Sequence, residues 1–225
     1  MLAAKQASMT VPIVFLSGED PVRLGLVASL AHPGGNLTGI NFFNRELASK
    51  QLEFLRELVP SANRVAVLVN PTDAMKSTLQ DVESAARIKG LQIQFVHAST
   101  SREIDAVFAA FERERPDALF VTADPFFGSR RLQLSLLAMR HAVPAIYSGR
   151  EYAEVGGLIS YGSDITDAYR RAGVYVGRIL KGAKPKDMPV IQSEKLELIV
   201  NAQSARALGL TVPQSLMVEA DDVLE

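Results

Sequence analysis

A chain of 225 residues with 48% hydrophobic content is long and apolar enough to bury the core of one large domain or of two small lobes. Its 24 Lys and Arg are spread among 25 Asp and Glu without a basic run, so the electrostatic footprint of a nucleic-acid-binding protein is missing. Cysteine is absent, which excludes disulfides, thiolate catalysis and Cys-ligated metal sites.

The first residues predict no targeting segment in the sequence as written. Residues 1–6 (MLAAKQ) lack a basic start followed by an apolar core, so they do not form a signal peptide. No apolar run approaches the roughly 20 residues that a membrane span requires. If the chain starts where the protein starts, these features predict a cytoplasmic location.

Short apolar runs alternate with helical periods along the chain. The runs typical of strands buried on both faces of a parallel sheet cover residues 13–16, 65–69, 118–122 and 143–147. Further strands are expected at 37–40 and, with alternating polarity that indicates a sheet edge, at 93–97. Apolar residues repeat at helical spacing in 24–31, 48–59, 75–86, 104–111, 132–139 and 169–179. This alternation predicts right-handed βαβ crossovers and an open α/β sheet.

Polar motifs recur where strands end. They are SGEDP at 17–21, NPTD at 70–73, TADP at 122–125 and YGSD at 161–164. In open α/β sheets, ligands bind at the carboxyl ends of strands, near the positive ends of the following helices. An Asp before Pro is also a good helix N-cap, so each motif taken alone fits a purely structural role as well. The TSRE sequence at 100–103 predicts a capping box and no function.

Residues 147–164 (YSGREYAEVGGLISYGSD) combine two short strands, a glycine pair and a helix cap in one polar, aromatic corner. The chain contains no Walker, G-x-G-x-x-G or G-x-S-x-G motif, so nucleotide binding and a hydrolase triad are unsupported. Its three histidines show no metal-ligand spacing. We therefore expect a ligand-binding corner without a nucleophile, metal or cofactor.

Several segments, in a fixed order along nearly the whole chain, carry a family resemblance. They include DPV at 20–22, PGGNLTG at 33–39, VAVLVNP at 65–71, GGLISYG at 156–162 and RILKGAKP at 178–185. Together they resemble the ABC transporter substrate-binding proteins of the tryptophan/tyrosine-uptake type.

The resemblance implies a two-lobed, type I periplasmic-binding-protein fold with parallel sheets flanked by helices. Residues 1–42 and 164–225 would form the first lobe, and residues 43–163 the second. Members of this family carry roughly a further hundred residues before the matching part, a length compatible with two or three βαβ units. On this reading the first lobe is incomplete and lacks its signal sequence and leading strands.

The resemblance also implies a function. The chain would be the solute-binding component of an ABC import system, located in the periplasm. It would bind an amino acid or similar small molecule in the cleft between two lobes and deliver it to an ABC permease in the membrane. Neither catalysis nor nucleic-acid binding is expected, and the oligomeric state stays open.

The expected ligand-binding residues combine carboxylates, amides and two aromatic rings. Carboxylates can accept hydrogen bonds from an ammonium group, and an aromatic face can pack on an apolar side chain. Asn41 and Asp164 would also flank the hinge. The seven residues are Asp20, Asn41, Asn70, Asp124, Tyr147, Tyr161 and Asp164.

Two other classes of protein remain alternatives. The same fold serves as the ligand-sensing effector domain of lac-repressor-like regulators or signalling receptors, although no basic helix-turn-helix is visible here, and fold alone does not decide function. An enzyme is the less favoured alternative, in which Asp20 and Asp124 would do acid–base work. Nothing in their spacing supports that pairing.

Overall fold

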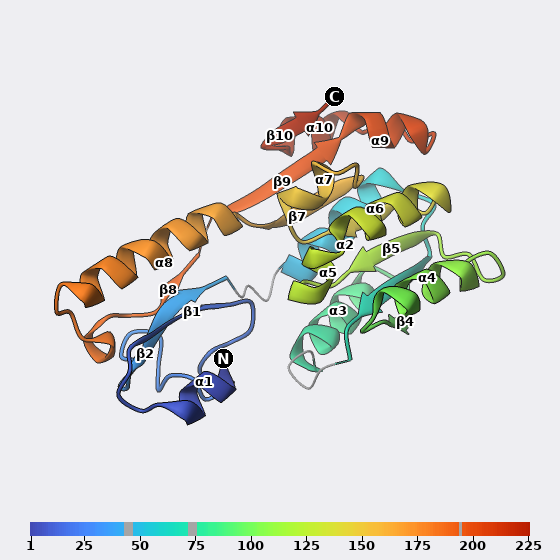
Figure 1. Cartoon of the computed structure of the whole chain (residues 1–225). Coiled ribbons are helices and arrows are strands. Elements are labelled where there is room, and N and C mark those ends of the chain that lie inside the picture. Colours follow the sequence, from blue (N-terminus) through green and yellow to red (C-terminus); the bar gives the residue numbers. More distant parts are fainter. Residues whose placement is uncertain (43–46, 72–75, 194) are drawn as a thin grey trace. The chain divides into compact units, whose positions relative to one another are not determined.

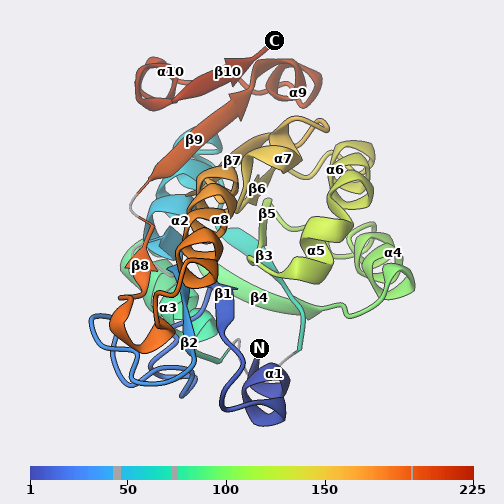
Figure 2. The same cartoon turned by 60° about the vertical axis from the view of Figure 1, so that its left-hand side comes forward.

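The computed structural model describes residues 1–42, 47–71, 76–193 and 195–225, which fold into two compact units. Unit 1 consists of Met1–Asn44 and Ser163–Leu196, and unit 2 of Arg45–Gly162 and Glu197–Glu225. Figures 1 and 2 show both units as strands flanked by helices. The predicted α/β class, with parallel sheets flanked by helices, is confirmed.

Unit 2 is built on a seven-stranded sheet in the order β10-β9-β7-β6-β5-β3-β4. The pairs β3–β4, β3–β5, β5–β6, β6–β7 and β9–β10 are parallel. The strands are β3 (Arg64–Val69), β4 (Gln92–His97), β5 (Ala118–Val121), β6 (Ala145–Tyr147), β7 (Ile159–Ser163), β9 (Leu196–Asn201) and β10 (Asp222–Leu224).

Helices cover both faces of this sheet. They are α2 (Leu47–Leu58), α3 (Lys76–Ile88), α4 (Ser101–Ala110), α5 (Pro125–Ser129), α6 (Arg131–Arg140), α7 (Arg150–Ala153), α9 (Ala202–Ala207) and α10 (Gln214–Glu219). Successive residues of β3 point to opposite faces: Val65 and Val67 join a core with α2 and α3, whereas Ala66 and Leu68 join a second core with α4 and α6. Burial on both faces explains the continuous apolar run of β3.

Unit 1 has a three-stranded parallel sheet in the order β1-β2-β8, formed by β1 (Ile13–Ser17), β2 (Leu37–Asn41) and β8 (Ile191–Gln192). The long helix α8 (Ile165–Leu180) packs on it through Ala168 and Ala172, which contact the cluster around Ile40. A short helix α1 (Leu2–Ala7) and a 3₁₀ turn η2 (Pro185–Asp187) complete the unit. None of the described helices is long and apolar enough to cross a membrane.

The expected helix over residues 24–31 does not form. Residues 21–25 make a turn instead, in which Gly25 adopts a left-handed φ of 66° and the Leu26 N–H donates to the Pro21 carbonyl at 2.8 Å. Leu26 and Val27 are nevertheless buried, against Phe15 of β1. The helical spacing therefore predicted correctly that apolar side chains of this segment are buried. It predicted the wrong backbone conformation, because Gly25 reverses the chain after a few residues.

The structure also corrects the expected division of the chain at residues 197–225. We expected them in the first lobe, but they belong to unit 2. The reason is the position of β9, which lies between β7 and β10 and buries Leu198 and Val200 in the core beside α2. The chain therefore changes unit at 44/45, 162/163 and 196/197.

Candidate functional site

In unit 2, the carboxyl ends of neighbouring strands β3 and β5 bring two predicted residues together. Asn70 directly follows β3, and Asp124 is the N-cap of α5 after β5. Asn70 Nδ2 donates to Asp124 Oδ1 at 3.1 Å, and the backbone N–H of Phe126 donates to the same oxygen at 2.8 Å. Asp124 is therefore both a helix cap and a member of a polar pair at the sheet edge. Thr72 and Asp73, from the same motif as Asn70, lie outside the described residues.

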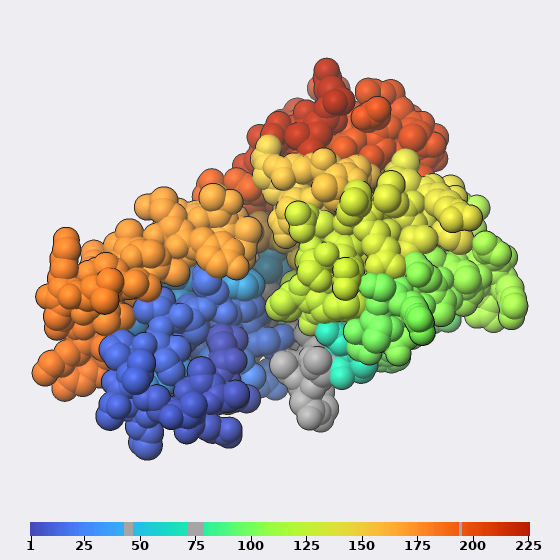
Figure 3. Space-filling model, viewed as in Figure 1, coloured from blue at the N-terminus to red at the C-terminus, as the bar shows by residue number. Residues whose placement is uncertain are grey.

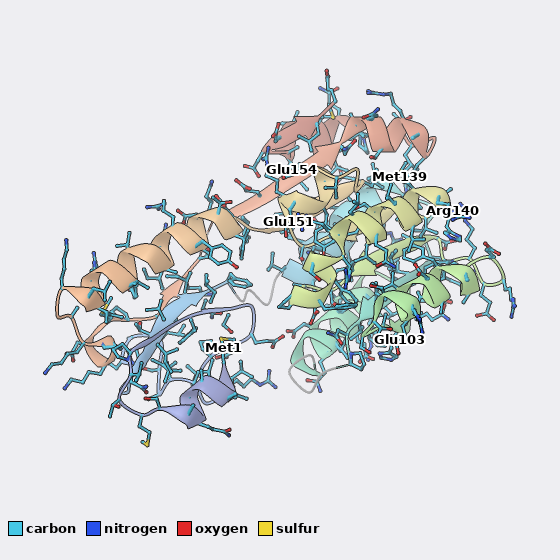
Figure 4. The ribbon with its side chains drawn as sticks, viewed as in Figure 1. Met1, Glu103, Met139, Arg140, Glu151 and Glu154 are labelled. Atoms are coloured by element: carbon cyan, nitrogen blue, oxygen red, sulfur yellow. The ribbon has the colours of Figure 1, made fainter. Side chains whose placement is uncertain are left out.

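Tyr152 of α7, the helix that follows β6, lies within electrostatic range of Asp124, and Glu151 precedes it in the same helix. Tyr152 has a buried ring, and the pKa of its phenol is raised by burial and then by the negative charges of Glu151 and Asp124, among others. Both carboxylates thus lie close enough for their charge to act on the Tyr152 hydroxyl. Figure 4 shows Glu151 on α7, with Glu154 one turn further along. We call Asn70, Asp124, Glu151 and Tyr152 the edge cluster.

The backbone at Gly149 makes room for Glu151. A Cβ atom at position 149 would lie 2.5 Å from Glu151 Oε2, so the carboxylate folds against the glycine backbone. Any larger residue at 149 would displace Glu151 from the edge cluster. Sequence reasoning missed Glu151 and Tyr152 as candidates, although both lie inside the tract of residues 147–164 that it singled out.

The structure gives Tyr147 a supporting role instead of a ligand-facing one. Its ring is 0% exposed and stacks on Tyr152, with ring centres 4.6 Å apart and planes 16° apart. Its buried hydroxyl makes no hydrogen bond of normal geometry with a described residue. Burial raises the pKa of this phenol, and the nearby Ser135 side chain acts in the opposite direction. A side chain fully enclosed within unit 2 cannot offer its face to a solute, because core residues have no free side.

Tyr161, the second predicted aromatic, is half-buried on β7. Its ring meets Phe54 of α2 edge-on, with centres 5.0 Å apart, and its carbonyl accepts from Gln51 Nε2 at 2.7 Å. These contacts fasten β7 to α2. Arg150, in the same tract, is likewise tied to Glu154 at 3.0 Å and to Asp222 of β10.

The remaining three predicted residues lie in unit 1. Asp20 Oδ1 accepts from the N–H groups of Val22 and Arg23 at 2.9 and 3.2 Å, which is the capping role within a turn. Asn41 ends β2 and is only 3% exposed, and its carbonyl accepts from the Ser193 N–H at 2.7 Å.

Asp164 is the N-cap of α8 and is held by several contacts. It accepts from the Asp167 N–H at 3.0 Å and pairs with Lys195 Nζ at 2.6 Å. The hydrogen bond from Lys195, followed by that from Asp167, lowers the pKa of the Asp164 carboxyl. Asp164 and Lys195 both stand next to positions where the chain changes unit.

Each unit has a surface cavity that is lined by none of the seven predicted residues. A cavity of about 520 Å³ lies between β4 and α4 in unit 2, lined by residues that include Val96, Val107 and Phe111. A cavity of about 710 Å³ in unit 1 lies beside α1. The Thr100–Glu103 capping box beside the first cavity is confirmed. Within the described parts of the chain, no group of His, Asp or Glu residues is arranged to hold a metal ion.

Comparison with known proteins places this geometry in context. A model of the family described as ABC transporter substrate binding protein matches residues 2–224. The Tyrosine-binding protein of Clostridioides difficile is 28% identical over 209 residues, which cover 92% of this chain and 60% of the relative. The chain thus spans less than two thirds of that relative's length.

Solved structures agree with the family match. The structure of an ABC domain from Streptococcus pneumoniae in complex with L-Trp matches with a TM-score of 0.88 and 28% identity, covering 98% of this chain and 74% of the other. A LacI family transcriptional regulator from Bifidobacterium animalis matches with a TM-score of 0.57 and 14% identity, covering 83% of this chain and 75% of the other. At that identity, the regulator supports a shared fold alone.

Proposed function

Because this chain belongs to the family of ABC transporter substrate-binding proteins, we propose that it binds an amino acid, with L-tyrosine and L-tryptophan as the first candidates. The choice of ligand follows from two similar proteins, one named for tyrosine binding and one solved with L-Trp. The family membership and a site without a nucleophile favour binding without catalysis.

The observation that carries the proposal is how the two carboxylate oxygens of Asp124 are hydrogen-bonded. Both hydrogen bonds that its carboxylate makes with described residues reach Oδ1, from Asn70 and from the Phe126 N–H. Oδ2 accepts from no residue that the structure describes, and in this proposal it accepts a hydrogen bond from the ligand ammonium while the two donors hold the carboxylate in one orientation. Glu151 adds a second negative charge near the Tyr152 hydroxyl. Such an arrangement favours a cationic group over an anionic one.

In this proposal the partner is an ABC permease in the membrane, and the protein acts on the extracytoplasmic side. Both statements rest on the family, since substrate-binding proteins deliver solutes to such permeases. A regulator's effector domain is the weaker alternative, because the matching regulators share only the fold at identities of 17% or below.

The test compares two carboxylates at opposite edges of the same sheet. Asp124→Asn should weaken binding of L-tyrosine or L-tryptophan by tenfold or more in isothermal titration calorimetry, because it removes the charge that faces the ammonium. Asp117→Asn is the matched control. Asp117 Oδ2 accepts from the N–H groups of Asn63 and Arg64 at 2.9 and 2.8 Å at the amino end of β3, so its loss should lower stability and leave affinity unchanged.

Tyramine, which keeps the ammonium, should compete better than the corresponding acid without it. If Asp124→Asn lowered the free energies of binding and of unfolding by the same amount, Asp124 would be a helix cap and not a ligand-binding residue. Absence of binding by any amino acid would refute the proposed function itself.

A further inference from the structure

Positive charge is unevenly divided between the two units. Unit 1 contains nine Lys and Arg against six Asp and Glu, a net charge of +3. Unit 2 contains 15 Lys and Arg against 19 Asp and Glu, a net charge of −4. The chain's overall charge of −1 therefore hides a cationic unit joined to an anionic one.

The excess in unit 1 is concentrated where α8 ends. Elsewhere in the described part of the unit, Asp167 pairs with Arg170 and Arg171, and Asp164 pairs with Lys195. By contrast, four exposed cations form no ion pair with any residue that the structure describes, and we call them the basic patch: Arg178, Lys181, Lys184 and Lys186. Asp187 is the single acid among residues 178–190.

A well-defined chain reversal holds the basic patch in place. Helix α8 ends at Leu180, Gly182 adopts a left-handed φ of 102°, and the Ala183 N–H returns to the Arg178 carbonyl at 3.1 Å. This is the hydrogen bond of a Schellman motif. The η2 turn then follows, so the four side chains leave one short segment in close succession. Figures 1 and 3 show this segment, in orange, on the surface at one end of unit 1.

Buried contacts anchor the segment behind the patch. Met188 and Val190 are 7% and 5% exposed, and Tyr175 Oη donates to the Pro189 carbonyl at 2.8 Å. The Val190 N–H also donates to the Leu30 carbonyl at 2.7 Å. The cations therefore extend from a fixed backbone and not from a free loop.

We propose that the basic patch docks unit 1 onto an anionic phospholipid surface. Three of its four cations are lysines, which interact as point charges on long aliphatic stems and suit a fluid array of phosphate headgroups. Leu180 lies among them and is 82% exposed, so an apolar side chain is available to enter the headgroup layer. Charge complementarity to the basic patch selects an anionic surface, and the exposed Leu180 among the cations favours a lipid layer over a nucleic acid, because only the lipid offers an apolar phase.

The experiment is co-sedimentation of the 225-residue chain with vesicles. We expect binding to vesicles of phosphatidylcholine with phosphatidylglycerol at low ionic strength, no binding to phosphatidylcholine alone, and a steady loss of binding as NaCl is added. Each cation near such a surface strengthens binding about fivefold. A variant with all four cations of the basic patch replaced by Gln should therefore bind several hundredfold more weakly, beyond detection by sedimentation.

A matched variant distinguishes the effect of the basic patch on vesicle binding from the effect of the chain's net charge. It replaces four exposed arginines of unit 2 by Gln and lowers the charge by the same amount, at Arg87, Arg102, Arg113 and Arg140. This control should bind the anionic vesicles as the parent does, and circular dichroism should show that both variants are folded. Three results would overturn the proposal: no binding of the parent to anionic vesicles, binding of the basic-patch variant to them, or an equal loss of vesicle binding in both variants. Amino-acid binding is a separate measurement, so failure here leaves the proposed function untouched.

Discussion

The side chains of Asn70 and Asp124 stand 54 positions apart in the sequence, yet Asn70 Nδ2 donates to Asp124 Oδ1 at 3.1 Å. The contact exists because β3 and β5 are adjacent parallel strands, with Leu68 opposite Val121, so the residues after both strands emerge at one edge. It fixes the orientation of the carboxylate that we propose binds the ligand ammonium.

Asn70→Ala should therefore weaken amino-acid binding about three- to tenfold, because Asp124 loses one of the two donors that orient it. Stability should fall by about 1 kcal/mol, the usual cost of one hydrogen bond. Calorimetric titration and urea unfolding measure the two effects. Gln133→Ala is the control, since Gln133 Nε2 donates to Asp105 Oδ1 at 2.7 Å in the same unit, away from the edge cluster. A Gln133 variant with the same loss of affinity would contradict the positioning role.

Removing the Tyr147 hydroxyl should leave the protein unchanged or more stable. This hydroxyl is buried with no hydrogen bond of normal geometry to a described residue, and the interaction of Ser135 with it is weaker than the effect of burial. Leaving such a group unsatisfied costs about 1–3 kcal/mol. Tyr147→Phe keeps the ring that supports Tyr152, so we expect a gain of up to about 1 kcal/mol in the free energy of unfolding. Tyr175→Phe should instead lose about 1 kcal/mol, because its hydroxyl donates to Pro189 at 2.8 Å. Equal destabilisation by the two changes in urea unfolding would mean that Tyr147 has a partner.

Much of the fold could be predicted from the sequence because the apolar pattern and the tertiary structure agree. The run at 65–69 is buried on both faces within β3, and the helical period at 169–179 lies inside α8, which ends near Gly182 as expected. Residues 24–31 show the limit of such reasoning. Their apolar side chains are buried as a helix would bury them, but hydrogen bonds to Pro21 and the left-handed Gly25 produce a turn.

The candidate site was predictable only in part. A motif after a strand predicts a position at the sheet edge, which was enough to place Asn70 beside Asp124. Whether an aromatic side chain there faces outward depends on the few residues between strand and helix. Tyr147, the last residue of β6, and Tyr152 of the short α7 are both buried and stack on each other, and the charge of Asp124 acts on the Tyr152 hydroxyl. Strand alternation sets such directions, and apolar periodicity does not reveal them in a three-residue strand.

The ion pair of Asp164 with Lys195 should make stability depend on pH in one direction. The pKa of Asp164 is lowered in the folded state, so the pair contributes stability above the unfolded value of about 3.9 and loses it as the pH falls toward the folded value. Asp164→Asn keeps an oxygen for the Asp167 N–H but removes the charge. The parent should therefore be more stable than this variant at neutral pH, and the difference should vanish in acid.

Lys195→Met should reproduce this pH-dependent loss. The effect is expected to be small and reduced by salt, because the Lys195 side chain is 57% exposed. Asp164→Ala removes the cap as well and should lose about 1 kcal/mol more than Asp164→Asn. Urea unfolding at several pH values measures all three variants. If the parent remained more stable than Asp164→Asn in strong acid, the contribution of the pair would not be electrostatic.

Two glycines of unit 1 should respond to alanine in opposite ways. Gly39 of β2 lies opposite Phe15 of β1, and a Cβ atom there would sit 2.1 Å from the Phe15 carbonyl oxygen, which the backbone cannot accommodate without separating the strands. Gly39→Ala should therefore lower the free energy of unfolding by about 3 kcal/mol.

Gly173 is exposed in α8, and its Cβ position has no atom of another element within 4 Å. Gly173→Ala should therefore raise the free energy of unfolding by about 0.5–1 kcal/mol through helix propensity. Calorimetric melting of both variants beside the parent tests the pair. If Gly39→Ala melted like the parent, the close approach of β1 and β2 would be wrong, and with it the register Phe15–Gly39 on which the sheet of unit 1 is built.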